Sequence, residues 1–304
     1  MLSYRHAFHA GNHADVLKHT VLVHLLRYLA KKETPYMVID THAGAGVYAL
    51  DSGYAAKSGE YASGIAQLWE RKDLPAPLAD YVQLVKDLNP NGKLRYYPGS
   101  PYCAYRILRE QDRLRLFELH PSDITILQDN FHKLEQARRE ENRGGTRGKR
   151  ALIQRGDGFA GLKALLPPPS RRGLILIDPP YEVKDDYRRV RDTMADALTR
   201  FATGTYAIWY PILQRMESRQ LPDKLKRLPM HSWLHASLSI GAPSPDGFGL
   251  HSSGMFVVNP PWTLEKALQD VLPYLVEVLG KDGGARYVLE SGEAPTTKSR
   301  TSAS

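Results

Sequence analysis

The sequence is poor in cysteine and has no long apolar run. Cys103 is the only cysteine in 304 residues. A single cysteine excludes an intramolecular disulfide and a zinc site built from several cysteines, and it fits the reducing cytoplasm. No apolar run approaches the ~18 residues of a membrane-spanning helix, and the N-terminal residues MLSYRHAFHAGNHADV contain no apolar signal-peptide core. We therefore expect a cytoplasmic protein that neither spans a membrane nor is exported.

The composition is that of a globular protein with an excess of positive charge. Hydrophobic residues make up 42% of the chain and charged residues 24%, and the formal net charge is +8. Positive charge favours polyanionic partners, because binding to phosphates releases condensed counterions. Charge therefore makes a nucleic acid one partner to consider, although many soluble proteins are mildly basic.

Short apolar segments alternate with helical ones along most of the chain. The strand candidates are YMVID, RLRLFELH, ALIQR, GLILI and TYAIWYP, followed by SLSIG and GMFVV as a late antiparallel hairpin. Strands that alternate with helices predict a parallel sheet with helices on both faces. We expect an α/β, Rossmann-like fold with a mostly parallel seven-stranded sheet.

The pattern also suggests how the chain is divided. We expect residues 1–51 and 94–281 to form the main domain and residues 52–93 a small inserted helical subdomain. Residues 282–304 lack apolar periodicity and are expected to be disordered. The charged stretch 135–150 is expected to be a mobile loop, with basic residues that either bind phosphate or are only solvated.

Acidic residues stand at the ends of four strand candidates. Asp40, Glu118, Asp157 and Asp178 all follow apolar segments, and ligands of open α/β sheets bind outside the carboxyl ends of the strands. Asp40 opens DTHAGAG, where Gly44 would let a ligand approach the backbone closely. This glycine pattern matches neither the dinucleotide fingerprint nor the P-loop.

The stretch IDPPY, residues 177–181, predicts a clamp for a planar amine such as adenine N6. Asp178 could accept one N–H of the amine and the carbonyl of Pro179 the other, in a direction that proline stiffness sets in advance. Tyr181 could stack on the base. The alternative is that Asp-Pro-Pro only ends a strand. NPPW, residues 259–262, looks similar, but Asn259 cannot accept a proton as a carboxylate does, so we interpret it as a structural turn.

Several motifs together resemble a known family. DTHAGAG and IDPPY are similar to the cofactor and catalytic motifs of S-adenosylmethionine-dependent amino-methyltransferases. The N-terminal MLSYRHAFHAGNHADVLKH, YYPGSP, LFELHPSD and RRGLILIDPPYE narrow the resemblance, over about residues 1–280, to the RlmJ family of 23S rRNA adenine-N6 methyltransferases. The resemblance implies methyl transfer from S-adenosylmethionine to N6 of an adenine in 23S rRNA.

The resemblance also implies roles for individual residues. Those implied to contact the cofactor are Lys18, His19, His42, Gly44, Ser100, Glu118, Asp157, Gly158 and Asp178, with Glu118 on the ribose hydroxyls and Asp157 on the adenine amine. Asp178, Pro179 and Tyr181 are implied to be catalytic, and Tyr4, His6 and Tyr181 to contact the substrate. No metal is expected, because His9 and His13 form an incomplete ligand set.

Two other functions remain open. A DNA adenine-N6 methyltransferase could use the same clamp, although no separate DNA-reading module such as a helix-turn-helix is visible. A catalytically inactive RNA-binding protein could share the fold, although the intact Asp178-Pro179-Pro180-Tyr181 argues against it. We expect no obligate protein partner and, by default, a monomer.

Overall fold

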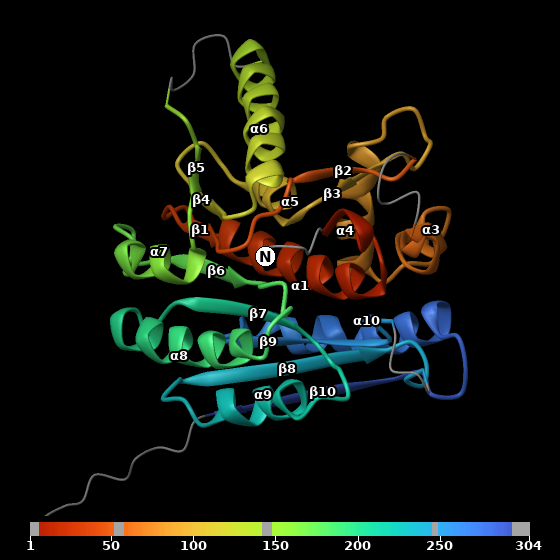
Figure 1. Cartoon of the computed structure of the whole chain (residues 1–304). Coiled ribbons are helices and arrows are strands. Elements are labelled where there is room, and N and C mark those ends of the chain that lie inside the picture. Colours follow the sequence, from red (N-terminus) through yellow and green to blue (C-terminus); the bar gives the residue numbers. More distant parts are fainter. Residues whose placement is uncertain (1–5, 52–57, 142–147, 245–248, 294–304) are drawn as a thin grey trace, which may run out of the picture.

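A computed structural model of the chain describes residues 6–51, 58–141, 148–244 and 249–293. Its centre is an eight-stranded sheet in the order β10-β8-β9-β7-β6-β1-β4-β5 (Figure 1). The strands are β1 (Met37–Asp40), β4 (Arg113–Glu118), β5 (Ala151–Arg155), β6 (Gly173–Ile177), β7 (Thr205–Pro211), β8 (Ser232–Ser239), β9 (Ser252–Val258) and β10 (Arg286–Glu293). In sheet order, the strands from β7 to β5 run parallel to one another. β9, β8 and β10 pair antiparallel with their neighbours. The Rossmann-like fold with a late hairpin is confirmed, with one strand more than expected.

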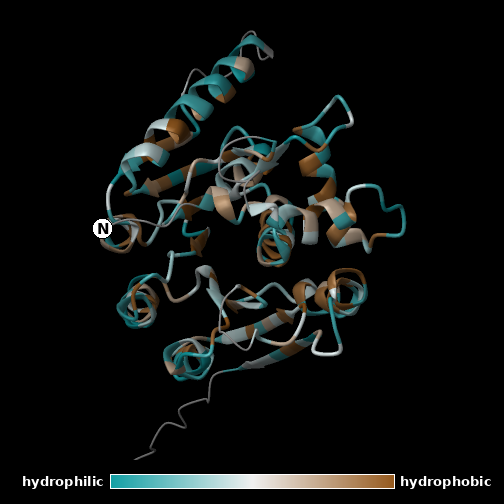
Figure 2. Cartoon of the chain, turned by 45° about the vertical axis from the view of Figure 1, so that its right-hand side comes forward, coloured by the Kyte–Doolittle hydropathy of each residue, from teal (hydrophilic) through white to brown (hydrophobic). Residues whose placement is uncertain are grey.

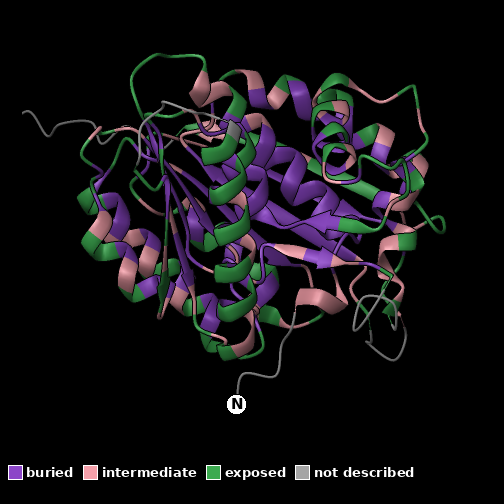
Figure 3. Ribbon diagram, turned by 90° about the horizontal axis from the view of Figure 1, so that it is seen from above, coloured by how far each residue is buried: buried purple, intermediate pink, exposed green. Residues whose placement is uncertain are grey.

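Helices cover both faces of this sheet, and Figure 3 shows the buried strands between their exposed outer surfaces. The helices are α1 (His13–Ala30), α5 (Ser100–Ile107), α6 (Pro121–Glu141), α7 (Gly158–Leu165), α8 (Asp185–Arg200), α9 (Met216–Lys226) and α10 (Thr263–Leu279). α1 packs against α5, α10, β7 and β9, while α7, α8 and α9 pack in a row. Figure 2 shows that the outer half of α6 is mostly hydrophilic.

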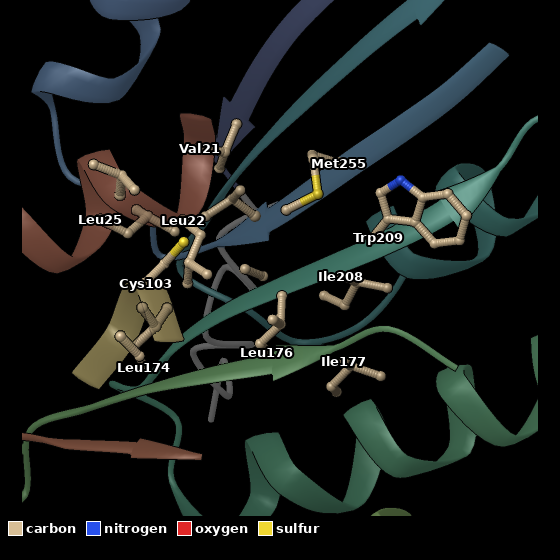
Figure 4. Packing of buried hydrophobic residues seen from close by; sticks show 14 of the residues in the cluster. Val21, Leu22, Leu25, Cys103, Leu174, Leu176, Ile177, Ile208, Trp209 and Met255 are labelled. Carbon is tan, nitrogen blue, oxygen red and sulfur yellow. The ribbon is translucent and has the colours of Figure 1, made fainter. Parts of the chain in front are cut away.

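The first helix is a core helix rather than a surface helix. Asn12 caps α1 by accepting hydrogen bonds from the amides of Ala14 and Asp15. From Val16 to Leu26 its apolar residues are buried on several sides of the helix, as is typical of a helix enclosed by its neighbours. Leu22 and Leu25 point toward Cys103 of α5 and Leu174 of β6 in Figure 4. The polar residues near the start of α1 are therefore carried into the middle of the molecule.

The segment between β1 and β4 contains the expected helices. β2 (Val47–Ala49) pairs antiparallel with β3 (Tyr96–Pro98) at its base. Between them lie the 3-10 helix η2 (Glu60–Ser63), the short α3 (Ile65–Leu68) and α4 (Ala76–Asp87). α4 packs on α1 through its buried face. The structure describes no helix that is long and apolar enough to cross a membrane.

The expectation of a disordered tail is wrong for residues 286–293. These residues form β10, which pairs with β8 from Arg286 opposite Ser239 to Glu293 opposite Ser232. Backbone pairing to an existing strand stabilises β10, and its side chains are mostly exposed. Apolar periodicity is absent for that reason and could not reveal the strand. Residues 294–304 lie outside the described part.

The expectation of a mobile basic loop over residues 135–150 is also wrong at both ends. Residues 135–141 continue α6, where Arg138 is buried and pairs with Glu110 at 2.8 Å and Glu135 at 3.0 Å. Arg150 is buried over the ring of Tyr105, 4.3 Å from its centroid. These two arginines are used inside the protein. Residues 142–147 lie outside the described part.

Removing β10 should destabilise the chain. The backbone of β8 would lose its hydrogen-bond partners, and Lys226 would lose Glu290, which lies 2.6 Å from it. A variant that ends at Ala285 should melt at least ~4 °C lower than wild type, the shift that a loss of ~2 kcal/mol produces in a domain of this size. A variant that ends at Glu293 is the matched control and should melt with wild type. Equal melting temperatures for both variants would show that β10 contributes no stability.

Candidate functional site

A cavity of about 300 Å³ lies across the carboxyl ends of the parallel strands. Its walls come from the ends of β1, β4, β5 and β6, together with residues of α1, α8 and the turn before α5. The chain order of the strands reverses between β1 and β6, and ligands of open α/β sheets bind at such a switch point. The cavity therefore occupies the place where the strand-end acids were expected to act.

A buried lysine joins two carboxylates at one end of this cavity. Lys18 Nζ donates to Asp178 Oδ2 at 2.6 Å and lies 2.8 Å from Asp15 Oδ1. Burial alone would lower the pKa of Lys18, but the two carboxylates raise it well above its usual range. The pKa of Asp15 is likewise held well below its usual range, against the effect of its burial, chiefly by His6 and Lys18. Lys18 and Asp15 are therefore charged near neutral pH.

Two histidines complete this end of the cavity. His6 Nε2 lies 2.9 Å from Asp15 Oδ2, which also accepts the amide of Gly11 at 2.9 Å. His19 Nδ1 lies 2.7 Å from the hydroxyl of Tyr97, and burial lowers the pKa of His19 to about 3. Its Nε2 is buried and has no partner in the described part of the chain. A neutral imidazole with one unused nitrogen lines the cavity and suits a polar ligand group.

Glu118 lies at the end of β4 and accepts two backbone amides. Gly44 N donates to Oε2 at 2.7 Å, and His120 N donates to Oε1 at 2.6 Å. Burial raises the pKa of Glu118, although these hydrogen bonds oppose the shift. Gly44 has a φ of +61°, and a Cβ there would lie 2.3 Å from the Tyr48 hydroxyl. Glycine thus allows the loop to bring its backbone to the carboxylate.

Asp157 and Gly158 form the turn from β5 into α7. Asp157 caps α7 by accepting the amide of Phe159 at 3.0 Å, and its other oxygen pairs with Arg189 of α8. A Cβ on Gly158 would lie 2.0 Å from the carbonyl oxygen of Thr41. Only glycine permits this close approach between the turn and the loop after β1.

Asp40 lies behind the cavity wall at the end of β1. Ser100 Oγ donates to its Oδ2 at 2.7 Å, and His42 N donates to its Oδ1 at 3.2 Å. Burial raises the pKa of Asp40 to about 7. Burial also lowers the pKa of His42 to about 3, and its ring packs edge-on against Phe159 at 4.8 Å. Asp40 thereby positions two of the predicted cofactor contacts.

The structure brings most of the predicted site residues together, with three exceptions. The predicted residues that line the cavity are His6, Lys18, His19, His42, Gly44, Ser100, Glu118, Asp157, Gly158 and Asp178. Pro179 and Tyr181 are buried and do not line it. The Tyr181 hydroxyl donates to Trp209 O at 2.7 Å, with φ at +51°. Tyr181 supports the loop in this conformation and is not placed to stack on a base. Tyr4 lies outside the described residues.

Sequence reasoning missed Arg189 and the role of Asp15. Asp15 stands three residues before Lys18, a spacing that places side chains side by side on a helix, so this signal was present. Arg189 reaches Asp157 only because α8 packs beside α7, which no local pattern reveals. The interpretation of NPPW is confirmed, because Asn259 Nδ2 donates to the carbonyls of Ala202 and Gly204 at 2.8 and 2.7 Å.

The sheet order and the strand-end cavity define a Rossmann-like methyltransferase fold. The sequence profile of the family described as "Ribosomal RNA large subunit methyltransferase D, RlmJ" matches residues 33–289. The chain belongs to this family.

Curated relatives and a solved structure agree with that assignment. "Ribosomal RNA large subunit methyltransferase J" of Escherichia coli K12 is 50% identical over 275 residues, which cover 90% of this chain and 93% of the relative. The Haemophilus influenzae protein of the same name is 46% identical, with 95% and 98% covered. A crystal structure of a Legionella pneumophila protein is 36% identical, has a TM-score of 0.81, and shares 93% of this chain and 98% of that one.

Asp15→Asn should lower the free energy of unfolding by ~3 kcal/mol, because it removes one of two counterions from a buried ammonium. Urea unfolding of the variant and wild type measures this difference. Asp270→Asn is the matched control, since Asp270 and Lys266 are 57% and 79% exposed and 3.9 Å apart. Exposed pairs contribute little, so the control should unfold like wild type. An Asp15 variant as stable as the control would contradict the buried-pair account.

Asp40 should make stability depend on pH. Its folded pKa of about 7 lies above its ordinary value of 3.8, so the folded chain binds this proton more tightly than the unfolded chain. Its contribution is therefore complete below about pH 4 and is lost as the pH rises through about 7. Urea unfolding between pH 4 and pH 8 should show Asp40→Asn gaining stability relative to wild type with rising pH. A difference that stays constant over this range would contradict the raised pKa.

Proposed function

We infer that this protein transfers the methyl group of S-adenosylmethionine to the N6 amine of an adenine in 23S rRNA. The observation that carries the inference is the state of Asp178. Lys18 holds its Oδ2, and within the described residues Oδ1 has no hydrogen-bond partner. A carboxylate so placed at a strand-end cavity can accept one N–H of an amine. Membership of the family supports ribosomal RNA over DNA as the polymer.

The residues that line the cavity fit the cofactor. When bound, S-adenosylmethionine supplies an electrophilic methyl group on a positively charged sulfur. Asp178 and Asp157 provide negative charge, and the unpartnered Nε2 of the neutral His19 suits a polar group of the cofactor. Glu118 suits the ribose hydroxyls, since a carboxylate accepts two such bonds. These assignments are supported by the cavity and by the chemistry of each group.

Asp178 is placed to orient the amine and to receive its proton, and Lys18 and Asp15 hold Asp178 in position. Transfer to the amine would form an N–C bond while the C–S bond of the cofactor breaks, and Asp178 Oδ1 would accept the proton that the methylated nitrogen loses. Asp178 Oδ1 holds an N–H of the amine and directs the lone pair toward the methyl group. Lys18 keeps Asp178 from turning away, because it is itself held by Asp15. Orientation of this kind is the main requirement of an in-line displacement.

The target adenine must leave its stack before it reaches Asp178, at a cost of a few kcal/mol. We propose that the enzyme acts on 23S rRNA before the large subunit matures, when helices still open. We further propose that it works as a monomer in the cytoplasm. The relatives named for the ribosomal large subunit support this setting.

Asp178→Ala should reduce methyl transfer by at least ~100-fold, the size of loss expected for one preorganised polar group. Tritium transfer to 23S rRNA from cells that lack the gene, followed by nucleoside mass spectrometry, should give N6-methyladenosine with wild type only. Asp196→Ala is the matched control, because Asp196 pairs with Arg200 on the outer side of α8. Because Asp178 lines the cavity and pairs with Lys18, circular dichroism at the assay temperature, and not cofactor binding, reports whether both variants are folded.

Parallel reactions with assembled large subunits and duplex DNA test the substrate. Free rRNA should be methylated fastest. A faster reaction with mature subunits would overturn the proposed timing, and methylation of DNA alone would overturn the proposed polymer. Wild-type transfer retained by Asp178→Ala would remove the carboxylate from the mechanism.

A further inference from the structure

A second cavity, of about 580 Å³, lies between α8 and α9. Its lining is basic: Lys184, Arg188 and Arg191 from the start of α8, Lys224 and Arg227 from the end of α9, and the single acid Glu217. Tyr187, Leu221 and Leu228 form its floor. We call these nine residues the α8–α9 groove. Figure 1 shows α8 and α9 side by side on the face of the sheet opposite α10.

The groove and the active-site cavity lie on two sides of α8. Asp186 and Arg189 of α8 line the active-site cavity, whereas Tyr187, Arg188 and Arg191 line the groove. Lys184 directly follows Val183, which lines the active-site cavity and is 55% exposed. The ring of Tyr187 packs on that of Tyr181 with centroids 4.6 Å apart. The groove therefore begins one residue beyond the lining of the active-site cavity.

The charges of the groove are unevenly balanced. Lys184 pairs with Glu217 at 3.5 Å, and Arg188 pairs with Asp185 at 2.8 Å. Arg188 and Arg191 also share Asp192, at 3.6 and 2.5 Å. Lys224 and Arg227 are exposed, and within the described residues neither side chain forms an ion pair or hydrogen bond. The side of the groove formed by the end of α9 therefore carries uncompensated positive charge.

We propose that the α8–α9 groove binds the phosphate backbone of the RNA strand that flanks the target adenine. The proposal rests on the proposed function, and it adds a surface that holds the polymer outside the catalytic cavity. Lys184 and Arg191 are seven residues apart, so they span ~10 Å along the helix. The row is therefore longer than one nucleotide step and can meet more than one phosphate of a strand. Arg138 and Arg150, for which phosphate binding was one of two expectations, are buried: Arg138 pairs with Glu110 and Glu135, and Arg150 packs on the ring of Tyr105.

Lys224 and Arg227 also lie at the C-terminal end of α9, where a cation stabilises the helix dipole whatever it binds. The test must therefore separate RNA binding from helix stability. The double variant Lys224→Gln with Arg227→Gln removes the uncompensated charge. The matched control, Lys266→Gln with Lys281→Gln, removes two exposed lysines from α10 and the residues just after it.

Filter binding of a 23S rRNA transcript across a range of salt concentrations measures the effect. At low salt the groove variant should bind the transcript at least about fivefold more weakly than wild type. Its plot of log K against log salt should be less steep by ~1.4, which is ~0.7 for each of the two lost contacts to a single strand. The KM for RNA should rise by a similar factor, while kcat, cofactor affinity and melting temperature stay near wild type. The control variant should match wild type in each measurement.

The outcomes separate this proposal from the proposed function. If both double variants bind RNA with the same affinity and slope, the groove is not the RNA path. If the groove variant loses kcat or melting temperature and keeps its RNA affinity, its role is structural and the proposal fails. If wild type binds RNA but transfers no methyl group, the proposed function fails, and the binding comparison still decides the role of the groove.

Discussion

The ammonium of Lys18 is the interaction on which the site depends. It is almost fully buried, and a charge there is tolerated only because Asp15 and Asp178 lie within 2.8 Å of it. Asp15 belongs to α1 and Asp178 to the loop after β6, so one charge ties the first helix to the catalytic loop. The depth of α1 in the core follows from its apolar residues, and its polar start is placed at the strand ends as a result.

The parallel half of the sheet gathers the remaining site residues. Asp40, Glu118, Asp157 and Asp178 come from distant parts of the sequence, yet each ends a strand at the same edge of the sheet. Their surroundings differentiate them chemically. Asp40 is deeply buried and its pKa is raised to about 7, whereas Lys18 is paired with Asp178. Four similar carboxyl groups thus differ in burial and in partners within one small region of the molecule.

Most of the fold and the cofactor side of the cavity could be predicted from the sequence, because both follow from strand periodicity and from acids at strand ends. The features that escaped prediction depend on packing between distant elements. Arg189 contacts Asp157 across two helices, and Tyr181 turns inward to Trp209. Arg138 appeared to be a free surface charge and is held by two glutamates. A pattern of charges along a chain does not say which of them find partners in space.

The added strand β10 also determines how the sheet ends. Without it, β8 would be the edge, and most of β8 from Leu234 onward is buried. An apolar edge with open backbone groups is a template for pairing with a second chain. β10 instead presents Arg286, Glu290 and Glu293 on a mostly exposed strand. β10 is itself the edge strand, and charged side chains on an edge disfavour pairing with a second chain.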